Sequence, residues 1–540
     1  MPTHEVLNQA PPLQDYDPLA ADVALTEALR REGAGWSEPE VGSFARATAA
    51  QEVMGWGFEA NQNPPRLRTH DRFGHRLDEV EFHPSWHALM ALSIANGVHC
   101  APWRDPRPGA HVARAAKMLL VSQAEAGHGC PISMTYSAFA ALEQTPELLD
   151  EWAPRIVSLE YDPRMLPARE KKGVLIGMGM TEKQGGSDVR SNTTRAEPLG
   201  GGAYALTGHK WFCSAPMSDA FLVLAQAPRG LSCFLLPRWT PDGERNRLYL
   251  MRLKDKLGNR SNASSEVEFD RAWARLLGDE GRGVNTIVEM VNHTRLDCVV
   301  GAAAIMRQAL AQAIHHCAHR SAFGRRLIEQ PLMRAVLADL ALESEAATVL
   351  MMRLARAYDR RDEEGPFRRI ATAVAKYWVC KRAAPMVAEA LECLGGNGYV
   401  EESILPRIYR EAPLNSIWEG SGNVICLDVL RALQKEPRAC DALISELHLA
   451  RGADRRLDGA LDAVEAQLAQ PQEFEARRLV ESLALALQGA LLVRHSPPAV
   501  SDAFCSTRLA GDHRYAFGTL PASTDTSAIL SRAWPEAPAR

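Results

Sequence analysis

The sequence predicts an α+β fold in which a helical N-terminal domain, an antiparallel β-domain and a bundle of long helices follow one another, with an extra helical extension at the C-terminus. Two changes of period support this order. Apolar residues recur at helical spacing up to about residue 172, alternate from about 173 to 282, and return to helical spacing from about 283. Length is the third observation, because the later helical patterns are long enough for a bundle.

Composition narrows the class of protein before any motif is considered. At 540 residues the chain exceeds one ordinary hydrophobic core, so several domains are expected. A net charge of −5 gives no overall basic surface for nucleic acid or an anionic membrane. The 11 cysteines include no Cys-x-x-Cys pair, which argues against a zinc site and a disulfide framework. With no secretory leader or long apolar run visible, we expect a cytoplasmic protein without a membrane span or a bound metal.

Residues 1–172 are expected to form the N-terminal helical domain. Apolar residues repeat at three-and-four spacing over 22–31 and 111–125, as in amphipathic helices. The stretch His83-Pro84-Ser85-Trp86 is typical of a helix start, where proline is tolerated in the first turn. A loop is expected before it, over the Asn- and Pro-rich residues 61–65.

Residues 173–282 are expected to form the antiparallel β-domain. Short β-rich segments are separated by clusters of Gly, Pro, Asn and Asp, which is typical of a sandwich or a barrel. The expected strands are 173–180, 204–214, 220–227, 231–237, 248–253 and 265–269. The alternative is a set of loops around isolated hairpins.

Residues 283–433 are expected to form the helical bundle, and residues 434–540 the extra helical domain. Long helical patterns joined by short connections predict neighbouring helices that pack side by side. The expected helices of the two regions are 285–320, 331–361, 367–394, 453–470 and 474–492. The residues after Ser496 are rich in Pro, Ser and Thr and carry a weaker helical signal.

The first motif that could carry chemistry is Met178-Gly-Met-Thr-Glu-Lys-Gln-Gly-Gly-Ser-Asp188, which follows an apolar strand. Its adjacent glycines let backbone amides approach a ligand, and Thr181 and Ser187 add hydroxyl donors. This combination suits a phosphate or the edge of a flavin. The motif is neither a P-loop nor a Gly-x-Gly-x-x-Gly fingerprint. The alternative to a ligand-binding loop is a plain turn between strands.

The second motif, Trp211-Phe212-Cys213-Ser214, lies in an alternating strand. The indole is a candidate stacking partner for a planar cofactor, with Cys213 or Ser214 hydrogen-bonding beside it. Packing within a sheet is the alternative interpretation of the same residues.

The third and fourth motifs lie at the ends of long helices. Arg320 opens the stretch Arg-Ser-Ala-Phe-Gly, which includes Phe323, and its guanidinium suits phosphate oxygens. A solvated turn between helices is the alternative. Gly395 and Gly396 belong to Leu-Gly-Gly-Asn-Gly-Tyr, which has more glycine than a helix cap needs. Such a stretch lets the backbone pass close to a pyrophosphate.

The fifth motif surrounds Glu419, beside Trp418. Ser416 and Glu419 have the spacing of a capping box. Glycines at 420 and 422 would weaken a helix there, so a loop that presents Glu419, with a helix starting near Asn423, fits better. A carboxylate buried beside an apolar neighbour tends toward a raised pKa, which suits a general base.

The order of these motifs is more specific than any one of them. A strand followed by TEKQGGSD, a Trp-containing strand, RSAFG between long helices, LGGNGY and WEGSGN in succession resembles the acyl-CoA dehydrogenase family, from about residue 90 to about 433. The stretches MGMTEKQGGSDVRSNTTRAEP, GHKWF, RLKDKLGNRSNAS and NSIWEGSGN, with the long C-terminal extension, resemble its AidB branch, the alkylation-response flavoproteins. The resemblance implies the acyl-CoA dehydrogenase fold and bound FAD.

By this resemblance, residues of three motifs contact FAD. They are Met180, Thr181, Gly186, Ser187, Trp211, Phe212, Cys213, Ser214, Trp418 and Asn423. Arg320, Phe323, Gly395 and Gly396 would reach the FAD of a neighbouring subunit, which implies a homotetramer built as a dimer of dimers. Cys213 stands where the family usually has Thr, and Glu392 stands where many members have Gln.

Glu419 stands where most of the family keeps its catalytic base. The implied reaction is the α,β-dehydrogenation of an acyl-CoA or related thioester, which is an oxidation of a CH–CH donor. Glu419 would remove the α-proton while a hydride leaves the β-carbon for flavin N5. The Glu419 backbone amide and a ribityl hydroxyl would bind the thioester carbonyl. An electron-transfer flavoprotein is the implied acceptor.

The AidB branch also offers an alternative, a DNA-associated protein of the alkylation stress response with weak or vestigial dehydrogenase activity. Its extra C-terminal domain would bind double-stranded DNA, here through Arg451, Arg455, Arg456, Arg477 and Arg478. From Gln434 to Arg540 the chain has 12 Lys and Arg against 14 Asp and Glu, a net charge of −2. Because affinity for duplex DNA rests largely on basic side chains, a solvated helix surface is the other interpretation.

Overall fold

The computed structural model describes residues 3–534, and the chain divides into two compact units. The helical unit contains the chain up to Gln51, residues 107–124, and the chain from Arg295 onward. The β-unit contains residues 52–106 and 125–294. Each unit therefore brings together segments that are far apart in the sequence.

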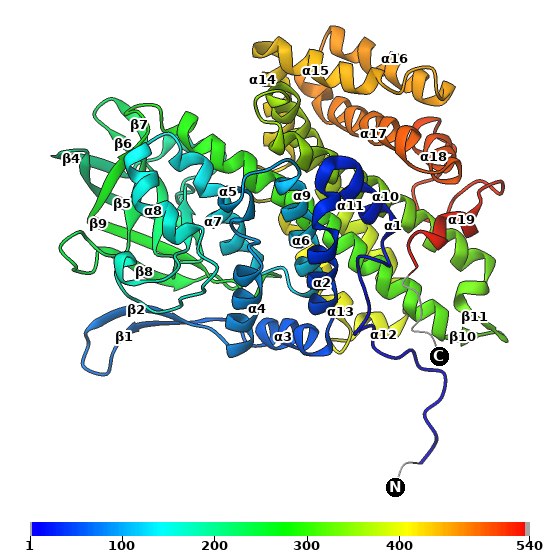
Figure 1. Cartoon of the computed structure of the whole chain (residues 1–540), viewed down its shortest axis with the longest axis horizontal. Helices are drawn as coiled ribbons and strands as arrows, with labels where there is room; N and C mark the ends of the chain where they lie inside the picture. The colour runs from blue at the N-terminus through cyan, green and yellow to red at the C-terminus, as the bar shows by residue number, and fades with distance from the viewer. Residues whose placement is uncertain (1–2, 535–540) are drawn as a thin grey trace. The chain divides into compact units, whose positions relative to one another are not determined.

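A sheet of seven strands forms the centre of the β-unit (Figure 1). Its strands are β3 (Ile176–Gly179), β4 (Arg195–Gly200), β5 (Ala203–Ser214), β6 (Ala220–Ala227), β7 (Gly230–Pro237), β8 (Leu248–Leu253) and β9 (Ser264–Leu277). The strand order is β3-β6-β4-β5-β9-β7, and β8 pairs with β9. Because β6 also pairs with β7, the path closes on itself as a barrel. This confirms the predicted β-domain.

The interior of the barrel explains the alternating pattern. Phe221 and Val223 of β6, Phe234 of β7 and Leu206 of β5 belong to one buried cluster, each at most 1% exposed. Most strand pairs are antiparallel, as expected, but β3 and β4 both run parallel to β6. Parallel pairing needs no local turn, so no short-range signal in the sequence predicts it.

Helices and a hairpin complete the β-unit. They are α3 (Gln51–Gln62), β1 (Arg66–His70), β2 (Arg76–Glu81), α4 (Pro84–Ala95), α5 (Ala101–Arg104), α7 (Gly129–Leu142) and α8 (Pro146–Ile156). The predicted start of α4 is confirmed, since His83 accepts a hydrogen bond from the Ser85 amide at 3.3 Å. The β1–β2 hairpin is a correction to the helical reading of this region. Its strands are mostly charged, and ion pairs such as Arg68–Glu81 lie across it.

Long helices build the helical unit (Figure 1). Up to the end of the bundle they are α1 (Val23–Leu29), α2 (Glu38–Thr48), α6 (Ala110–Ala124), α9 (Gly283–His319), α10 (Pro331–Asp359), α11 (Gly365–Cys393), α12 (Gly396–Tyr399), α13 (Ile404–Glu411) and α14 (Gly422–Lys435). The first residues of α9, to Thr294, belong to the β-unit. The three long helices expected from the sequence are confirmed as α9, α10 and α11.

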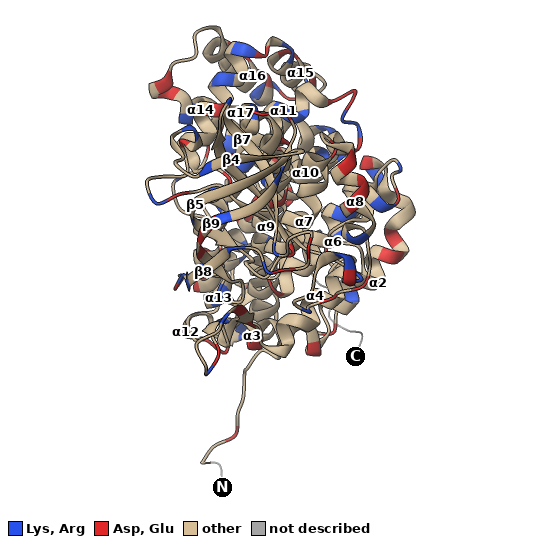
Figure 2. Ribbon diagram, turned by 90° about the vertical axis from the view of Figure 1, so that its left-hand side faces the viewer, with Lys and Arg blue, Asp and Glu red and all other residues tan. Residues whose placement is uncertain are grey.

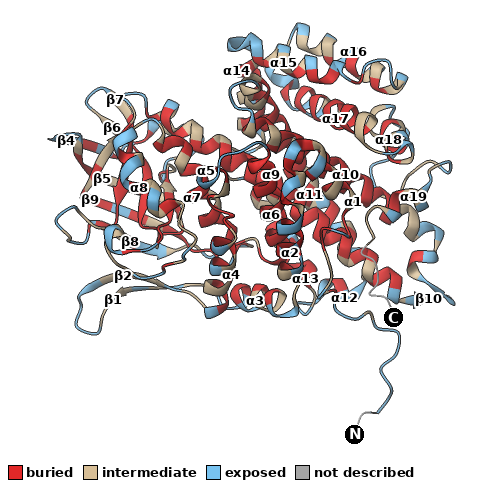
Figure 3. Cartoon of the chain, viewed as in Figure 1, coloured by how far each residue is buried: buried red, intermediate tan, exposed pale blue. Residues whose placement is uncertain are grey.

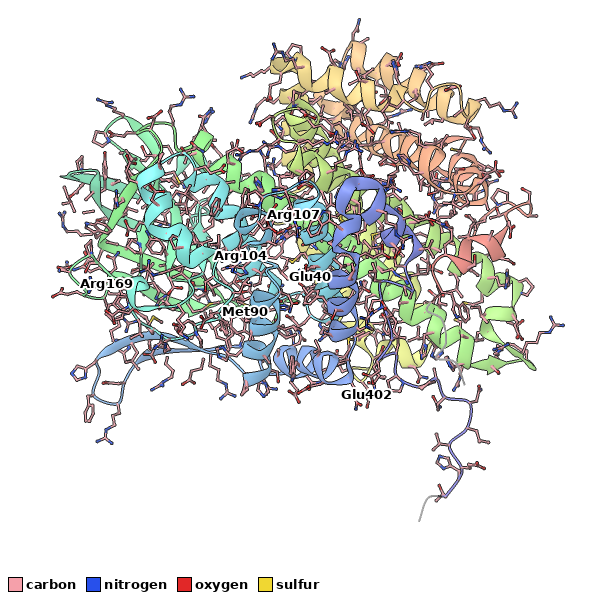
Figure 4. All side chains as sticks on the ribbon, in the orientation of Figure 1. Glu40, Met90, Arg104, Arg107, Arg169 and Glu402 are labelled. Carbon is pink, nitrogen blue, oxygen red and sulfur yellow. The ribbon has the colours of Figure 1, made fainter. Side chains whose placement is uncertain are left out.

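Burial extends over much of the central helices of this unit, as the mostly red ribbons of α6, α10 and α11 in Figure 3 show. All 15 residues of α6 are buried, including its charged ones. Arg114 forms a bidentate ion pair with Asp297 of α9, and Lys117 Nζ lies 2.5 Å from Glu40 Oε1 of α2, a residue labelled in Figure 4. Pairing is what makes buried charges tolerable.

The C-terminal extension is helical and packs on the bundle. Its helices are α15 (Pro437–His448), α16 (Arg455–Ala469), α17 (Ala476–His495), α18 (Pro498–Phe504) and α19 (Thr526–Ser531). Arg353 of α10 and Glu446 of α15 form a buried ion pair at 2.7 Å, and Trp378 Nε1 of α11 donates to Gln488 Oε1 of α17 at 3.1 Å. Across residues 3–534, no helix combines the length and apolarity that crossing a bilayer would need.

Candidate cofactor and active site

In the β-unit, the first two sequence motifs lie side by side. The amide of Trp211 in β5 donates to the carbonyl of Thr181 at 2.8 Å. Cys213 Sγ lies 3.9 Å from the carbonyl oxygen of Met178 in β3. The hydroxyl-bearing loop after β3 and the aromatic strand β5 therefore lie in direct contact, although 30 positions separate Thr181 from Trp211.

Gly186 is the position in this loop where a side chain has no room. A Cβ at Gly186 would lie 2.4 Å from Thr181 Oγ1 and 2.9 Å from its Cγ2. The loop backbone therefore packs directly on the Thr181 side chain. Ser187, the next residue, is exposed. The arrangement places the Thr181 hydroxyl, the exposed Ser187 and the glycine backbone within one short segment, as a phosphate or flavin edge requires.

A buried ion pair that the sequence motifs did not single out holds this loop. Lys210 Nζ of β5 lies 2.8 Å from Glu182 Oε1, and neither side chain is exposed to solvent. The Glu182 carboxylate also accepts the amides of Thr193 and Thr194. Burial alone would raise the pKa of Glu182, but the Lys210 ammonium and these hydrogen bonds lower it. On the same face of β5 as Lys210, Gly208 is half-buried and Phe212 is exposed, so no apolar alternation marks Lys210 as an inward-facing residue.

Cations surround the Trp211 ring. Lys254 Nζ lies 3.3 Å from the ring centroid, and Lys183 Nζ and Arg252 Cζ lie 5.6 Å and 5.8 Å from it. Lys254 is also paired with Glu266 at 2.7 Å. Phe212 beside them is 53% exposed. An aromatic face bordered by positive charge suits a planar, electron-rich group or an anion.

In the helical unit, Glu419 lies in a short loop before α14. A 3-10 turn, Leu414–Ser416, precedes it, and Trp418 Nε1 donates to Asn415 Oδ1 at 2.9 Å. Glu419 has a φ of +58°, in the left-handed region that residues with a Cβ rarely adopt, and Gly420 follows with +107°. Since Glu419 is outside any helix, the capping-box alternative does not describe it. The helix starts at Gly422, one residue before the expected Asn423.

The start of α14 has positive charge beside it. A Cβ at Gly422 would lie 2.9 Å from Lys381 Cε of α11 and 3.1 Å from its Nζ. Arg477 of α17 donates through Nε to the hydroxyl of Tyr377 at 3.1 Å. Asn423 belongs to the first turn of α14, where helix amides point outward and favour an anion.

The two remaining motifs lie at adjacent helix ends. Cys317 Sγ of α9 is 3.9 Å from the carbonyl oxygen of Cys393 in α11. After α9, a hairpin of β10 (Ser321–Ala322) and β11 (Arg325–Arg326) presents Phe323, which is 99% exposed. Arg320 Nη1 donates to the carbonyl oxygen of Asn8 at 2.5 Å. At the end of α11, Gly395 has a φ of +58° and Gly396 is exposed.

Two of the five arginines that would meet DNA, Arg451 and Arg456, pair with acids. Arg451 pairs with Asp462 at 2.9 Å and with Glu465 at 2.6 Å. Arg456 pairs with Asp454 and Asp502 at 2.6 Å and 2.7 Å. Arg455 and Arg478 point from exposed positions of α16 and α17. Both basic and acidic residues are present among α15, α16 and α17 in Figure 2.

A second buried network resembles catalytic chemistry without having access to a substrate. Ser93 Oγ lies 2.9 Å from His128 Nε2, and His128 Nδ1 lies 2.9 Å from Glu125 Oε2. This is the connectivity of a Ser-His-Glu triad. All three residues are at most 3% exposed, and Glu125 also accepts from Ser261 Oγ at 2.7 Å. The sealed network is a packing feature that joins α4, α7 and the loop before β9.

Comparisons with known proteins agree with this geometry. Three family models match the chain: the N-terminal domain of the adaptive response protein AidB over residues 8–163, and the middle and C-terminal domains of acyl-CoA dehydrogenase over 177–272 and 281–434. The AidB protein of Escherichia coli (strain K12) is 50% identical over 511 residues, which are 94% of each chain. Acyl-CoA dehydrogenase family member 11 of Caenorhabditis elegans is 31% identical, over 82% of this chain and 78% of its own.

Solved structures show the same fold. Caenorhabditis elegans ACDH-11 in complex with C11-CoA superposes with a TM-score of 0.83 at 28% identity, over 100% of this chain and 94% of its own. Butyryl-CoA dehydrogenase from Megasphaera elsdenii gives a TM-score of 0.59 at 23% identity, over 73% and 96%, and shares the fold. The predicted resemblance is confirmed over nearly the whole length, and the chain belongs to the AidB branch of the acyl-CoA dehydrogenase family.

Proposed function

We propose that the protein binds FAD and oxidises an acyl-CoA or related acyl thioester by α,β-dehydrogenation. The observation that carries the proposal is Glu419, a carboxylate held in the left-handed region with a φ of +58° in the loop before α14. Backbone strain of this kind persists where the surroundings enforce it, and it is concentrated at functional sites. The family membership of the chain supplies the reaction class.

The residues of the chain fit FAD on three observations. The Gly186 backbone packs on Thr181 so closely that a Cβ would collide with its hydroxyl. Trp211 offers an aromatic face with Lys254 3.3 Å from its centroid. In the other unit, the first turn of α14 begins with a glycine beside Lys381. Met180, Thr181, Gly186, Ser187 and Trp211–Ser214 in the β-unit, and Trp418 and Asn423 in the helical unit, are the proposed contacts.

In the proposed mechanism, the Glu419 carboxylate removes the proton from the α-carbon of the thioester. The backbone amide of Glu419 donates to the thioester oxygen, where negative charge develops as the proton leaves. Bound FAD supplies the hydride acceptor at N5 for the hydrogen on the β-carbon. The protein contributes position and charge, and the proton ends on Glu419.

The test is an anaerobic titration of the FAD-loaded protein with a panel of straight and branched acyl-CoAs. Flavin absorbance should bleach with at least one of them. Glu419→Gln should retain FAD and lose bleaching by about 10³-fold or more, since a general base contributes about 10²–10⁴-fold. Glu402→Gln is the matched control, because Glu402 is exposed in the turn before α13 and is labelled in Figure 4. Bleaching by Glu419→Gln at the wild-type rate would remove Glu419 from the base role.

Assembly, acceptor and location are part of the proposal. Arg320, Phe323, Gly395 and Gly396 would contact the FAD of a neighbouring subunit in a homotetramer, and the 99% exposure of Phe323 is consistent with such a contact. Light scattering should give the mass of four chains. An electron-transfer flavoprotein is the proposed acceptor, and the cytoplasm the proposed location. Residues 1–172, 173–282, 283–433 and 434–540 are the proposed domains.

A second candidate function is association with double-stranded DNA during the alkylation response. It is favoured by the match to the adaptive response protein AidB over residues 8–163. Arg455 and Arg478 are two of the exposed arginines of the predicted surface and serve to test it. A mobility shift should weaken steeply with salt, and weaken further in Arg455→Ala/Arg478→Ala. A shift that is unchanged by salt and by these substitutions would exclude binding through this surface.

A further inference from the structure

The loop that carries Glu419 is held by cations at three successive backbone carbonyls. Lys376 Nζ of α11 donates to the carbonyl oxygen of Trp418 at 2.8 Å, and also to that of Gly420. Arg295 Nε of α9 donates to the carbonyl oxygen of Glu419 at 3.0 Å. Hydrogen bonds from charged donors are stronger than neutral ones, so the peptide groups on both sides of Glu419 are fixed.

The two cations, Arg295 and Lys376, differ in whether a carboxylate neutralises their charge. Arg295 pairs with Asp428 of α14 at 2.8 Å, and Asp428 also pairs with Arg369 at 2.8 Å. Lys376 is 1% exposed, and among residues 3–534 no carboxylate forms an ion pair with it. Its hydrogen bonds go to the carbonyls that flank Glu419. A buried ammonium that is paired only with carbonyl dipoles carries a large desolvation cost, which an adjacent anion offsets.

Glu419 is the acidic residue between the two carbonyls that Lys376 binds. Burial raises the pKa of the Cys298 thiol in α9, the charge of Lys376 lowers it and the charge of Glu419 raises it further. One buried thiol therefore lies within electrostatic range of both charges. The other titratable or charged groups near this pair are Arg295 and Asp297 of α9, Cys380 and Lys381 of α11, and Cys426 and Asp428 of α14.

We call the hydrogen bonds from Lys376 and Arg295 to the carbonyls of residues 418–420 the clamp. The backbone conformation of the loop agrees with it. The residue between two carbonyls that accept from one ammonium can leave the ordinary helical and extended regions, because the charged donor stabilises the conformation. Glu419 does so, with a φ of +58°, and Gly420 continues with +107°. A Cβ at Gly420 would lie 3.0 Å from Ile425 Cδ1. The loop thus combines an unfavourable residue conformation with buried donors that compensate for it.

We propose that Lys376 is a positioning residue for Glu419. Its two hydrogen bonds hold Glu419 in the left-handed conformation, and its buried charge favours the ionised carboxylate that removes the α-proton. Arg295, oriented by Asp428, holds the third carbonyl. This inference rests on the proposed function for its catalytic meaning, whereas the clamp on the loop is independent of it.

The kinetic test compares Lys376→Met, Lys376→Gln and Lys376→Arg in the FAD-loaded protein. Lys376→Met should slow anaerobic flavin reduction by acyl-CoA about 100-fold with little change in KM, because a displaced base costs rate rather than affinity. The acidic limb of the pH–rate profile should move to higher pH in Lys376→Met and Lys376→Gln, since loss of a neighbouring positive charge raises the pKa of a carboxyl group. Lys376→Arg, which keeps the charge, should return the limb to its wild-type position. Lys376→Gln provides the same test if Lys376→Met does not fold.

The structural test does not need turnover. Glutamyl endopeptidase cleaves after glutamate, so it reports access to the Glu419–Gly420 bond. Lys376→Met and Lys376→Gln should be cut there at least about 10-fold faster than wild type, and amide hydrogen exchange over residues 417–423 should accelerate in parallel. Lys117→Met is the control, because Lys117 is also buried, with Glu40 as its partner in the same unit. It should leave this bond and these amides protected.

The outcomes separate the two proposals. If wild type never bleaches, the proposed function fails, and cleavage and exchange still decide whether the clamp exists. If wild type bleaches and Glu419→Gln does not, a wild-type rate and pH limb in Lys376→Gln would overturn the positioning role. Unchanged cleavage and exchange in every Lys376 variant would overturn the clamp itself.

Discussion

At the scale of single residues, the candidate site depends on positions where a small change in a side chain has a large geometric consequence. Gly186 packs on Thr181, and the buried ion pair of Glu182 and Lys210 holds the same loop. The sequence predicted the glycine and the hydroxyl because motifs display them. It did not predict the ion pair, because which charged residue of a strand points inward depends on register and bulges rather than on residue type.

Gly186→Ala should lower FAD affinity by about 10-fold or more, because the new Cβ would displace Thr181 from its place in the loop. The ratio of flavin to protein absorbance after dialysis measures this. Gly55→Ala is the control, since a Cβ there meets no atom within 4 Å. Full flavin occupancy in Gly186→Ala would contradict a role of this loop in cofactor binding.

Lys210→Met should destabilise the protein by about 3–5 kcal/mol, because it leaves the Glu182 carboxylate buried without its partner. Urea unfolding measures the change, and the double variant Lys210→Met/Glu182→Leu should recover part of it. The pKa of Glu182 is lowered in the folded state. The stability from this pair is therefore present above the ordinary glutamate pKa of about 4.3 and is lost as the pH falls further. A Lys210→Met variant as stable as wild type would show that the pair contributes nothing.

At the scale of elements, the sequence predicted best where burial follows a period. The strands β5, β6 and β7 and the helices α9 to α11 each lie within a few residues of their expected ranges. The hairpin β1–β2 and the strand β4 have exposed, charged or proline-containing sequences, so they carry no apolar alternation. The proximity of Thr181 to Trp211 depends on how the loop after β3 packs against β5, which is not the neighbour of β3 in the strand order, and no local pattern encodes it.

The N-terminus of α6 illustrates an element that depends on a distant partner. Asp359 at the end of α10 accepts the amide of His111 at 2.8 Å and that of Val112 at 3.3 Å. Burial raises the pKa of Asp359 to about 6, although these amides oppose the shift. The folded protein therefore keeps this proton to a higher pH than the unfolded chain, and the stability gained from it falls as pH rises from about 4 to about 6.

Asp359→Asn should remove that dependence. The difference in unfolding free energy between wild type and Asp359→Asn should change by about 1–3 kcal/mol between pH 4 and pH 6, with wild type losing stability as pH rises. Urea unfolding at a series of pH values measures it, and the difference cancels titrations common to both proteins. A difference that is constant with pH would show that Asp359 titrates normally.

At the scale of the whole molecule, the extension after Gln434 is part of the helical unit. Arg353 links α10 to Glu446 of α15, and Arg532 links the chain's end to Glu345 of α10 at 2.9 Å. Of its exposed arginines, Arg451 pairs with acids, whereas Arg455 and Arg478 remain the positions that test the proposed DNA association. The proposed FAD contacts and the proposed base, Glu419, all precede this extension in the chain.

The most direct measurement of the central claim is the primary isotope effect on flavin reduction. An acyl-CoA deuterated at the α-carbon should reduce the FAD-loaded protein several-fold more slowly than the protiated compound, because Glu419 removes that hydrogen in the step that reduces the flavin. Deuteration at the β-carbon should also slow it. Reduction that is insensitive to the α-hydrogen, or that proceeds equally well in Glu419→Gln, would contradict the account.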